Sequence, residues 1–499
     1  MFKSNLDTLF AALLGGLLVL ILTQHSGLGI SPDSIYYMSA ADSFLAGKGF
    51  YQFDDHPFVM FPVFYPFFLS IIKWVTGVNF LKVAPFINAF LFGFAILLVG
   101  RMLEKASASK YLKWLLLLIL LCSASLLEVY TMLWSETLFI VEVLLFIWIA
   151  EKYFHKFEWK YLILMALIAA ISSDTRLAGV SIIGTGGLLI LMCKQLKWPS
   201  KIKQGFVFGL ISVSFFSINL LRNAFLSQTL TGKRQKGVTP FVDNLRYYGS
   251  VLSEWLPFSK LLNGYPVIVG ILALVLLGGI FLYKWWKDSR QDGIQKIAAA
   301  FVLIYSFFML IVATISRFET MNNRLLSPLY IPLLLSVGLY LYASIQAIRS
   351  AYFKKSLLIL FFVIGSVCTY EELQWDFASY KEYKEGGIGG YSDDDWLISS
   401  GLLNYLVTHP GFFTAAHLPI YSNAAHAVYF RTGQHIQILP ERKYLDQVKA
   451  FHQKPKQLLI WFNEEDNAEV LTLEEVGNTK NLQILSKFND GVIYLCTSK

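Results

Sequence analysis

Eleven apolar runs dominate the sequence, and most of them are long enough to cross a lipid bilayer. A transmembrane helix needs roughly 20 apolar residues to span about 30 Å of hydrocarbon. The runs cover residues 9–24, 81–100, 112–128, 132–150, 160–172, 177–193, 205–226, 264–283, 297–316, 325–346 and 356–370. Because a backbone in lipid must satisfy its own hydrogen bonds, these runs predict a polytopic α-helical membrane protein with about eleven transmembrane helices.

The composition excludes the other broad classes. Of the 499 residues, 55% are hydrophobic and only 15% are charged, whereas a soluble domain carries about 25% charged residues. This much apolar surface excludes a disordered chain. The four cysteines are too few for a disulfide-stapled secreted domain, and no pair of them has metal-ligand spacing. The net charge of +8 lies in linkers between apolar runs, so no nucleic-acid partner is expected.

The distribution of Lys and Arg predicts the orientation in the membrane. If the N-terminus is cytoplasmic, five short linkers on that side hold sixteen Lys and Arg residues, while three short linkers on the other side hold only Arg176, Arg317 and Arg324. The positive-inside rule then favours a cytoplasmic N-terminus. An odd number of spans places residues 371–499 outside. We therefore expect a multi-pass protein of the inner (plasma) membrane, with a transmembrane module at 1–370 and an extracytoplasmic domain at 371–499.

Three polar regions fall on the predicted outer side, namely a first loop (25–80), a second loop (227–263) and the C-terminal domain. In the C-terminal domain, short strand-like pieces alternate with polar connectors, which predicts a small α/β domain. The pieces cover 419–422, 457–461 and 491–495. In the first loop, two apolar stretches at about 33–46 and 63–75 predict helices that lie along the outer membrane face.

Ionisable residues collect at the outer ends of the predicted spans, where each needs an explanation because charge is costly in hydrocarbon. They include Asp33 and His56 in the first loop, Glu136 at the start of the fourth run, and four arginines. The arginines are Arg176, Arg222, Arg317 and Arg324. This pattern predicts a cleft for a charged ligand. Structural roles compete at each position: a helix cap for Asp33, an ion pair with Arg176 for Glu136, and interfacial snorkelling for the arginines.

The first loop carries a recognisable order of residues. It reads Pro-Asp at 32–33, Tyr-Tyr at 36–37, Gly-Lys-Gly-Phe at 47–50 and Phe-Pro-Val-Phe-Tyr-Pro at 61–66. This order resembles the first extracytoplasmic loop of the GT-C membrane glycosyltransferases, nearest to the protein-mannosyltransferase and aminoarabinose-transferase branch (family 39/83 type). Segments that resemble later motifs of the family follow in order at 134–139, 175–179, 221–234, 324–332 and 421–433.

The resemblance implies a sugar donor linked to a polyprenyl phosphate and an inverting single displacement on an extracytoplasmic acceptor, which is a lipid, a glycan or a protein. Asp33 is then the catalytic base, and the arginines Arg324, Arg222, Arg176 and Arg317 bind the donor phosphate. The implied substrate cleft contains Tyr36, Tyr37, His56, Tyr65 and Glu136. No cofactor is expected, and a divalent metal at His56, Asp54 and Asp55 is a less favoured alternative. The chain departs from many relatives at Ser34, where they carry a second acid after the one at Asp33.

Other functions compete with this interpretation. The alternative nearest to a glycosyltransferase is a lipid-linked glycan polymerase or ligase. A transporter or flippase would place polar residues in mid-span and show internal repeats, and neither is evident. A non-catalytic assembly protein that uses 371–499 as a binding module would not need Asp33. The sugar, whether hexose or pentose, stays open.

Overall fold

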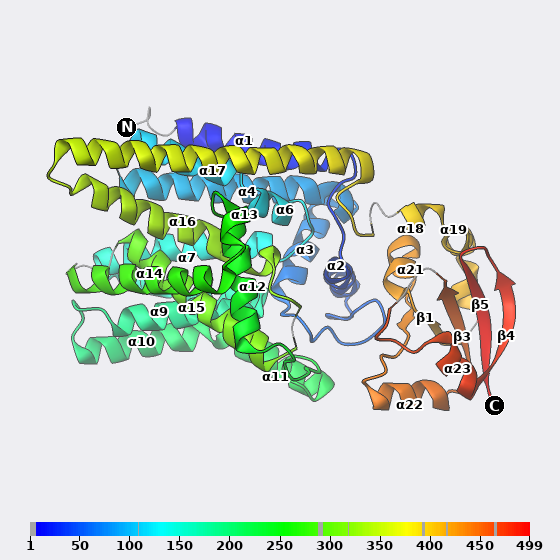
Figure 1. Ribbon diagram of the computed structural model, residues 1–499. Helices are drawn as coiled ribbons and strands as arrows, with labels where there is room; N and C mark the ends of the chain where they lie inside the picture. Colours follow the sequence, from blue (N-terminus) through cyan, green and yellow to red (C-terminus); the bar gives the residue numbers. More distant parts are fainter. Residues whose placement is uncertain are drawn as a thin grey trace. The chain divides into compact units, whose positions relative to one another are not determined.

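The computed structural model describes residues 6–107, 109–287, 293–317, 319–391, 395–415, 418–463 and 467–499. The chain divides into two compact units (Figure 1). The helical unit consists of 1–28, 59–65 and 78–385. The sheet unit consists of 29–58, 66–77 and 386–499. Arg290, one of the positive residues used to predict orientation, lies outside the described residues.

Helices cover every one of the eleven apolar runs. They are α1 (Leu6–Thr23), α4 (Phe80–Ala106), α5 (Lys110–Leu121), α6 (Ala124–Tyr130), α7 (Glu136–Lys156), α8 (Trp159–Thr175), α9 (Val180–Leu191), α10 (Trp198–Ser212), α11 (Ser214–Ser227), α14 (Pro266–Lys287), α15 (Ile294–Ile315), α16 (Asn323–Gln346) and α17 (Ala351–Gly386). Two runs contain a bend, of 52° between α5 and α6 and of 42° between α10 and α11.

In the part of the chain that the structure describes, fewer than eleven helices qualify as membrane spans when each helix is judged by its own length and apolar character. Among the described residues, six helices are long and apolar enough to cross a membrane, or up to eight if each bent pair is one span. They are α1, α4, α14, α15, α16 and α17. Helices α8 and α9 have 17 and 12 residues, and α7 carries three buried carboxylates, Glu136, Glu142 and Glu151. The expected count of eleven is therefore not confirmed, although the fold is the expected bundle of apolar helices.

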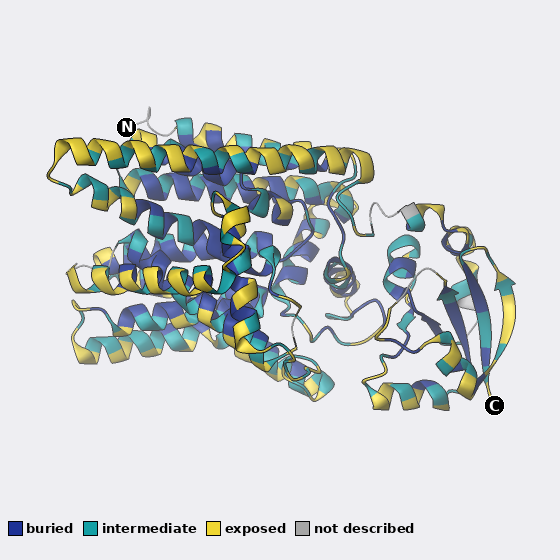
Figure 2. Cartoon of the chain, viewed as in Figure 1, coloured by how far each residue is buried: buried dark blue, intermediate teal, exposed yellow. Residues whose placement is uncertain are grey.

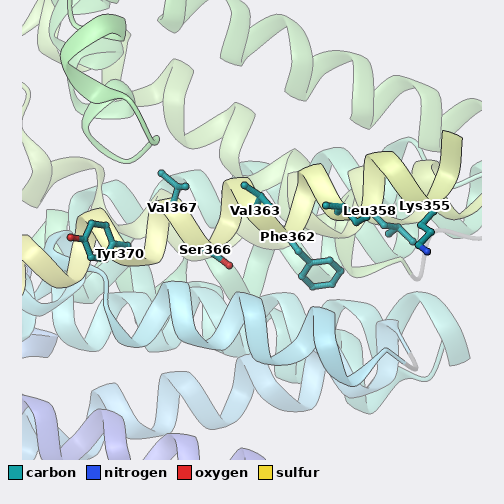
Figure 3. Close-up of a pocket in the computed structure, with 8 residues that line it drawn as sticks. Lys355, Leu358, Phe362, Val363, Ser366, Val367 and Tyr370 are labelled. Atoms are coloured by element: carbon teal, nitrogen blue, oxygen red, sulfur yellow. The ribbon is translucent and has the colours of Figure 1, made fainter. Parts of the chain in front are cut away.

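Burial separates the inner helices of this unit from the outer ones (Figure 2). In the apolar windows of α16, α14 and α17, 67%, 22% and 11% of the residues are buried. A shallow apolar groove of about 550 Å³ runs along α17, where Leu358, Phe362, Val363 and Val367 line it (Figure 3). An exposed apolar face on a helix of spanning length is what lipid contact requires. We therefore regard this groove as lipid-facing surface.

Both predicted loop helices are present, as α2 (Pro32–Leu45) and α3 (Phe64–Thr76). Their position along a membrane surface stays a prediction. The second loop contains helices that the sequence did not indicate, α12 (Phe241–Glu254) and the short α13 (Ser259–Leu262). Helix α12 packs against α14 at Gly249, where an added Cβ would lie 1.7 Å from the Pro266 carbonyl oxygen. Only glycine permits so close an approach of two backbones.

The sheet unit contains a five-stranded mixed sheet in the order β2-β1-β3-β5-β4. The strands are β1 (Ile420–Ser422), β2 (Gln437–Ile438), β3 (Lys456–Phe462), β4 (Lys480–Lys487) and β5 (Gly491–Ser498). Strands β1 and β2 pair in parallel, as do β1 and β3, while β5 pairs antiparallel with β3 and β4. The strand-like pieces predicted from the sequence are β1, β3 and β5. The edge strand β4 was not predicted, because most of its side chains are exposed and it lacks an apolar run.

Besides α2 and most of α3, this unit has six helices among the described residues after 386. They are α18 (Asp395–Ser399), α19 (Gly401–Thr408), α20 (Gly411–Ala415), α21 (Ala425–Thr432), α22 (Leu445–Gln453) and α23 (Leu473–Thr479). The division of the chain differs from the expected boundary at 370, because α17 continues to Gly386 and because α2 belongs to the sheet unit. All four cysteines are free and buried.

Candidate functional site

In the helical unit, one carboxylate joins two arginines. Glu136 Oε2 lies 2.5 Å from Arg176 Nη1, and Glu136 Oε1 lies 2.6 Å from Arg324 Nε. The Glu136 side chain is 0% exposed, and those of Arg176 and Arg324 are 14% and 12% exposed. The ion pair between Glu136 and Arg176, which the sequence analysis gave as the structural role of Glu136, is thus present, and Arg324 is a second partner. With all three groups ionised, these side chains carry one net positive charge, which suits an anionic ligand and which the half-exposed Glu319, 3.9 Å from Arg324, offsets in part.

The ends of three helices bring these side chains together. Glu136 is the first residue of α7, Arg324 lies in the first turn of α16, and Arg176 directly follows α8. Arg176 has an extended backbone, and its N–H donates to the Ser172 carbonyl oxygen at 3.0 Å. Gly179 makes this break possible, because a Cβ there would lie 2.2 Å from the same oxygen. A cation in the first turn of a helix opposes the helix dipole, so Arg324 needs its acidic partner.

Two residues that the sequence analysis did not select complete the cluster. The guanidinium of Arg324 lies over the Trp134 ring, 4.4 Å from its centroid, which adds a cation–π attraction. Arg176 Nη1 donates to Ser135 Oγ at 2.8 Å. Trp134 and Ser135 directly precede Glu136 in the sequence. Their position next to a candidate residue could therefore have identified them as candidates too. The planar guanidinium groups are thereby held in set orientations, as recognition of a phosphate requires.

A cavity of about 440 Å³ lies beside Arg324. Its acidic wall consists of Glu128, Glu254 and Glu319. Arg324 Nη1 lies 3.9 Å from Glu319 Oε1, and the Asn323 side-chain amide donates to Glu128 Oε2 at 2.6 Å. Trp134 and Tyr247 supply aromatic surface. A guanidinium and three carboxylates that line one cavity suit a ligand with both an anionic group and hydroxyl groups.

The other two predicted phosphate ligands lie outside this ion-pair cluster. Arg222 Nη1 donates to Asn223 Oδ1 at 2.9 Å. Arg317 Nη1 donates to Gln235 Oε1 at 2.7 Å, and the backbone N–H of Arg317 donates to the Gln235 carbonyl oxygen at 2.8 Å. Both arginines therefore have structural contacts, and their roles in phosphate binding stay predictions.

Asp33 belongs to the sheet unit, in the first turn of α2. The N-cap of this helix is Ser31, whose hydroxyl accepts from the Ser34 N–H at 3.4 Å, while Ser34 Oγ accepts from the Ser31 N–H at 3.1 Å. This reciprocal capping box, with Pro32 as the first helical residue, removes the alternative that Asp33 is the cap. Its half-buried carboxylate is instead placed where the helix dipole favours negative charge.

Aromatic rings hold α2 against α21. The Tyr36 ring meets His426 edge-on, with centroids 5.0 Å apart, and stacks on Phe53 at 5.6 Å. Burial lowers the pKa of His426 to about 4. Burial also raises the pKa of Tyr36, and the charges of Asp54 and Asp33 add to this effect. Both groups are therefore neutral at pH 7, which suits a packed interface.

The remaining cleft candidates have packing or ion-pair contacts. Tyr37 and Tyr65 are almost fully buried. His56 Nδ1 lies 3.2 Å from Asp54 Oδ2, and the hydrogen bond that His56 donates to this carboxylate raises the pKa of His56. Asp55 pairs with His435 instead, at 2.9 Å. Among the described residues, no group of three or more His, Cys, Asp or Glu side chains is arranged to hold a metal ion.

Comparison with known proteins rests on structure, since no protein-family model and no curated protein matches the sequence. The crystal structure of ArnT from Cupriavidus metallidurans bound to undecaprenyl phosphate superposes with a TM-score of 0.57, at 10% identity and over 96% of each chain. ArnT in the apo state gives 0.50, at 11% identity and over 96% of each chain. The arabinosyltransferase EmbB from Mycobacterium smegmatis gives only 0.37, at 12% identity, over 76% of this chain and 42% of that one.

The ArnT superpositions cover 96% of the chain, so they include both the apolar helices and most of the C-terminal sheet domain. At 10–11% identity, a likeness of this extent is a likeness of fold. It agrees with the fold that the motifs of the first loop implied. The chain therefore has the fold of ArnT from Cupriavidus metallidurans.

Proposed function

We propose that this protein transfers a sugar from a polyprenyl-phosphate-linked donor to an extracytoplasmic acceptor. The observation that carries the proposal is the fold likeness to ArnT, whose structure contains undecaprenyl phosphate, over 96% of both chains. The buried cluster of Arg176, Glu136 and Arg324 supports it, because a positively charged group is needed where a lipid phosphate leaves.

The reaction we propose is an inverting single displacement. The carboxylate of Asp33 takes the proton from an acceptor hydroxyl, whose oxygen attacks the anomeric carbon of the donor sugar. The bond from that carbon to the phosphate oxygen breaks, and the polyprenyl phosphate leaves with the electron pair. A base at about 2.6–3.2 Å from the hydroxyl is sufficient for this step. Arg324 and Arg176 offset the charge that grows on the leaving phosphate, and Arg222 and Arg317 are further candidates.

The charges of the cavity beside Arg324 favour one donor orientation. A phosphate is attracted to the guanidinium and repelled by Glu128, Glu254 and Glu319. Sugar hydroxyl groups can instead donate to those carboxylates, which accept hydrogen bonds when ionised. We therefore place the donor phosphate at Arg324 and the donor sugar toward the acidic wall.

Donor binding tests Arg324 directly. Arg324→Ala is expected to weaken the binding of undecaprenyl phosphate by roughly 10- to 150-fold, because a charge-assisted hydrogen bond contributes about 1.5–3 kcal/mol. Native mass spectrometry of the purified protein with added lipid measures this. Arg246→Ala is the matched control, because Arg246 forms an exposed ion pair with Asp243 on α12. Unchanged lipid affinity in a folded Arg324→Ala protein would remove Arg324 from the donor site.

The chemical activity is tested by mass spectrometry of cell-envelope lipids and glycans from cells with and without the protein. We expect a product heavier by a single sugar in the presence of the protein. A polymerase or ligase would instead add several sugars or a whole glycan. A transporter would leave all masses unchanged, an outcome that would refute glycosyl transfer.

We also propose that the N-terminus is cytoplasmic and that the sheet unit is extracytoplasmic. Thr408→Cys, at an exposed position of α19, is expected to react with a membrane-impermeant maleimide in intact cells. Lys197→Cys, exposed in the linker before α10, is expected to react only after the cells are permeabilised. The four native cysteines are buried and should give little background. The opposite labelling pattern would reverse the topology.

A further inference from the structure

One face of α2 borders a cavity of about 500 Å³ that lies wholly within the sheet unit. Ser39, Asp42, Ser43 and Ala46 line it at the spacing of one helical face. The rest of the wall comes from the loop after α2 and from the end of α21. These residues are Lys48, Tyr51, Asp55, Tyr429, Gly433 and His435.

This cavity is distinct from the position of the proposed base. Asp33 precedes the lining residues of α2 by six to thirteen positions, which corresponds to about 9–20 Å along the helix axis. At 3.6 residues per turn, Asp33 also lies on a different side of the helix from Asp42 and Ala46. Asp33 is not among the residues that line the cavity.

The charges at the cavity offset one another, because Asp42 and Asp55 are matched by Lys48 in the wall and by Lys73 beside Asp42, so a strongly charged ligand is disfavoured. Asp42 Oδ1 lies 2.6 Å from Lys73 Nζ, and Asp55 Oδ1 lies 2.9 Å from His435 Nδ1. Asp42 thus has a cationic partner and Asp55 a histidine partner within the same unit. Each carboxylate also has further lone pairs that can accept hydrogen bonds from hydroxyl groups. A neutral ligand that carries many hydroxyl groups fits this arrangement better than a phosphate or a metal ion.

A buried polar atom and two aromatic rings support the same class of ligand. The Ser43 side chain is 9% exposed, and its hydroxyl oxygen is buried with no hydrogen-bond partner among the described residues. Such a group is costly unless something satisfies it. The rings of Tyr51 and Tyr429 also line the cavity, and an aromatic ring can pack on the apolar C–H face of a sugar while its hydroxyl bonds to the ligand.

We propose that this cavity binds a neutral sugar unit of the acceptor, at a distance from the hydroxyl that reacts at Asp33. The assignment to the acceptor rests on the proposed function, whereas sugar binding itself does not. It implies that the acceptor is a glycan or a glycolipid of more than one sugar unit.

Calorimetric titration of the full-length protein in detergent tests the proposal. The probes are maltotriose, α-1,6-mannotriose, chitotriose and α-1,5-arabinotriose, with glucose 6-phosphate as a charged comparison. We expect at least one neutral oligosaccharide to bind. Tyr51→Ala should weaken that binding by about ten-fold or more, because a ring contact and a hydrogen bond are lost. Asp55→Asn should do the same and, at an exposed position, should leave the fold intact.

Matched controls separate the cavity from the rest of the unit. Tyr405→Ala removes a half-buried tyrosine of α19, and Glu474→Gln neutralises an exposed acid of α23, both outside the cavity. Both should bind like the wild type. Tyr51→Phe, which keeps the ring, should retain most of the affinity. The proposal is overturned if no neutral probe binds, if only glucose 6-phosphate binds, or if Asp55→Asn binds normally.

The two proposals fail separately. Oligosaccharide binding that depends on Tyr51 and Asp55, without any product heavier by a sugar, would contradict the proposed transfer and leave the sugar site standing. Sugar transfer without oligosaccharide binding would contradict the sugar site and leave the proposed transfer standing.

Discussion

Asp33→Asn is expected to fold normally and to lose sugar transfer by a factor of about 10²–10⁴, the usual contribution of a general base. Asparagine has nearly the shape of aspartate, but its amide cannot take a proton from an acceptor hydroxyl at neutral pH. The measurement is the rate of transfer from a polyprenyl-phosphate-linked sugar by the purified variant, with donor binding measured in parallel. Donor binding should change little, because the proposed phosphate ligands are arginines.

The structure makes the Asp33 experiment sharper than the sequence did, because the helix cap is Ser31. Removing the Asp33 charge should cost about 0.3–1 kcal/mol of favourable interaction with the helix dipole and leave the cap in place. Ser31→Ala is the matched control. It should lower stability by about 0.5–2 kcal/mol through loss of the cap, yet keep the transfer chemistry. Near-normal turnover by Asp33→Asn would leave the base unassigned.

Glu136→Gln is expected to lower the free energy of unfolding by about 3–5 kcal/mol, as when one member of a buried ion pair is removed. The variant removes the negative charge of Glu136. The nearly buried guanidinium groups of Arg176 and Arg324 then lose the carboxylate that both of them contact. Denaturant unfolding of the purified protein in detergent, followed by tryptophan fluorescence, measures the effect.

Two further variants test the origin of this loss. Glu319→Gln is the control, because Glu319 is 47% exposed and lies 3.9 Å from Arg324. An exposed pair of this kind contributes at most about 1 kcal/mol. Combining Glu136→Gln with Arg176→Met should cost less than the sum of the single changes, since the double variant has one buried charge fewer to compensate. A loss below 1 kcal/mol for Glu136→Gln alone would contradict a buried ion-pair cluster.

The sequence by itself determined where the long apolar helices lie and which residues stand at their ends. Helices cover all eleven apolar runs, and α2, α3, β1, β3 and β5 fall where local pattern predicted them. Apolar runs, and the alternation of apolar and polar residues along a strand, are local properties of the sequence. In lipid, a backbone has few ways to satisfy its hydrogen bonds, so a long apolar run predicts a helix. For the same reason the sequence could place Glu136, Arg176 and Arg324 at the ends of separate runs.

Only the tertiary structure decided which of these side chains meet. Glu136 pairs with both Arg176 and Arg324, whereas Arg222 and Arg317 contact Asn223 and Gln235. The cap of α2 is Ser31 although aspartate is also a favoured cap. The cavity beside α2 combines residues 39–55 with residues 429–435. An ion pair or a cavity depends on distances between side chains that are remote in sequence, and those distances are set by how helices pack rather than by any local pattern.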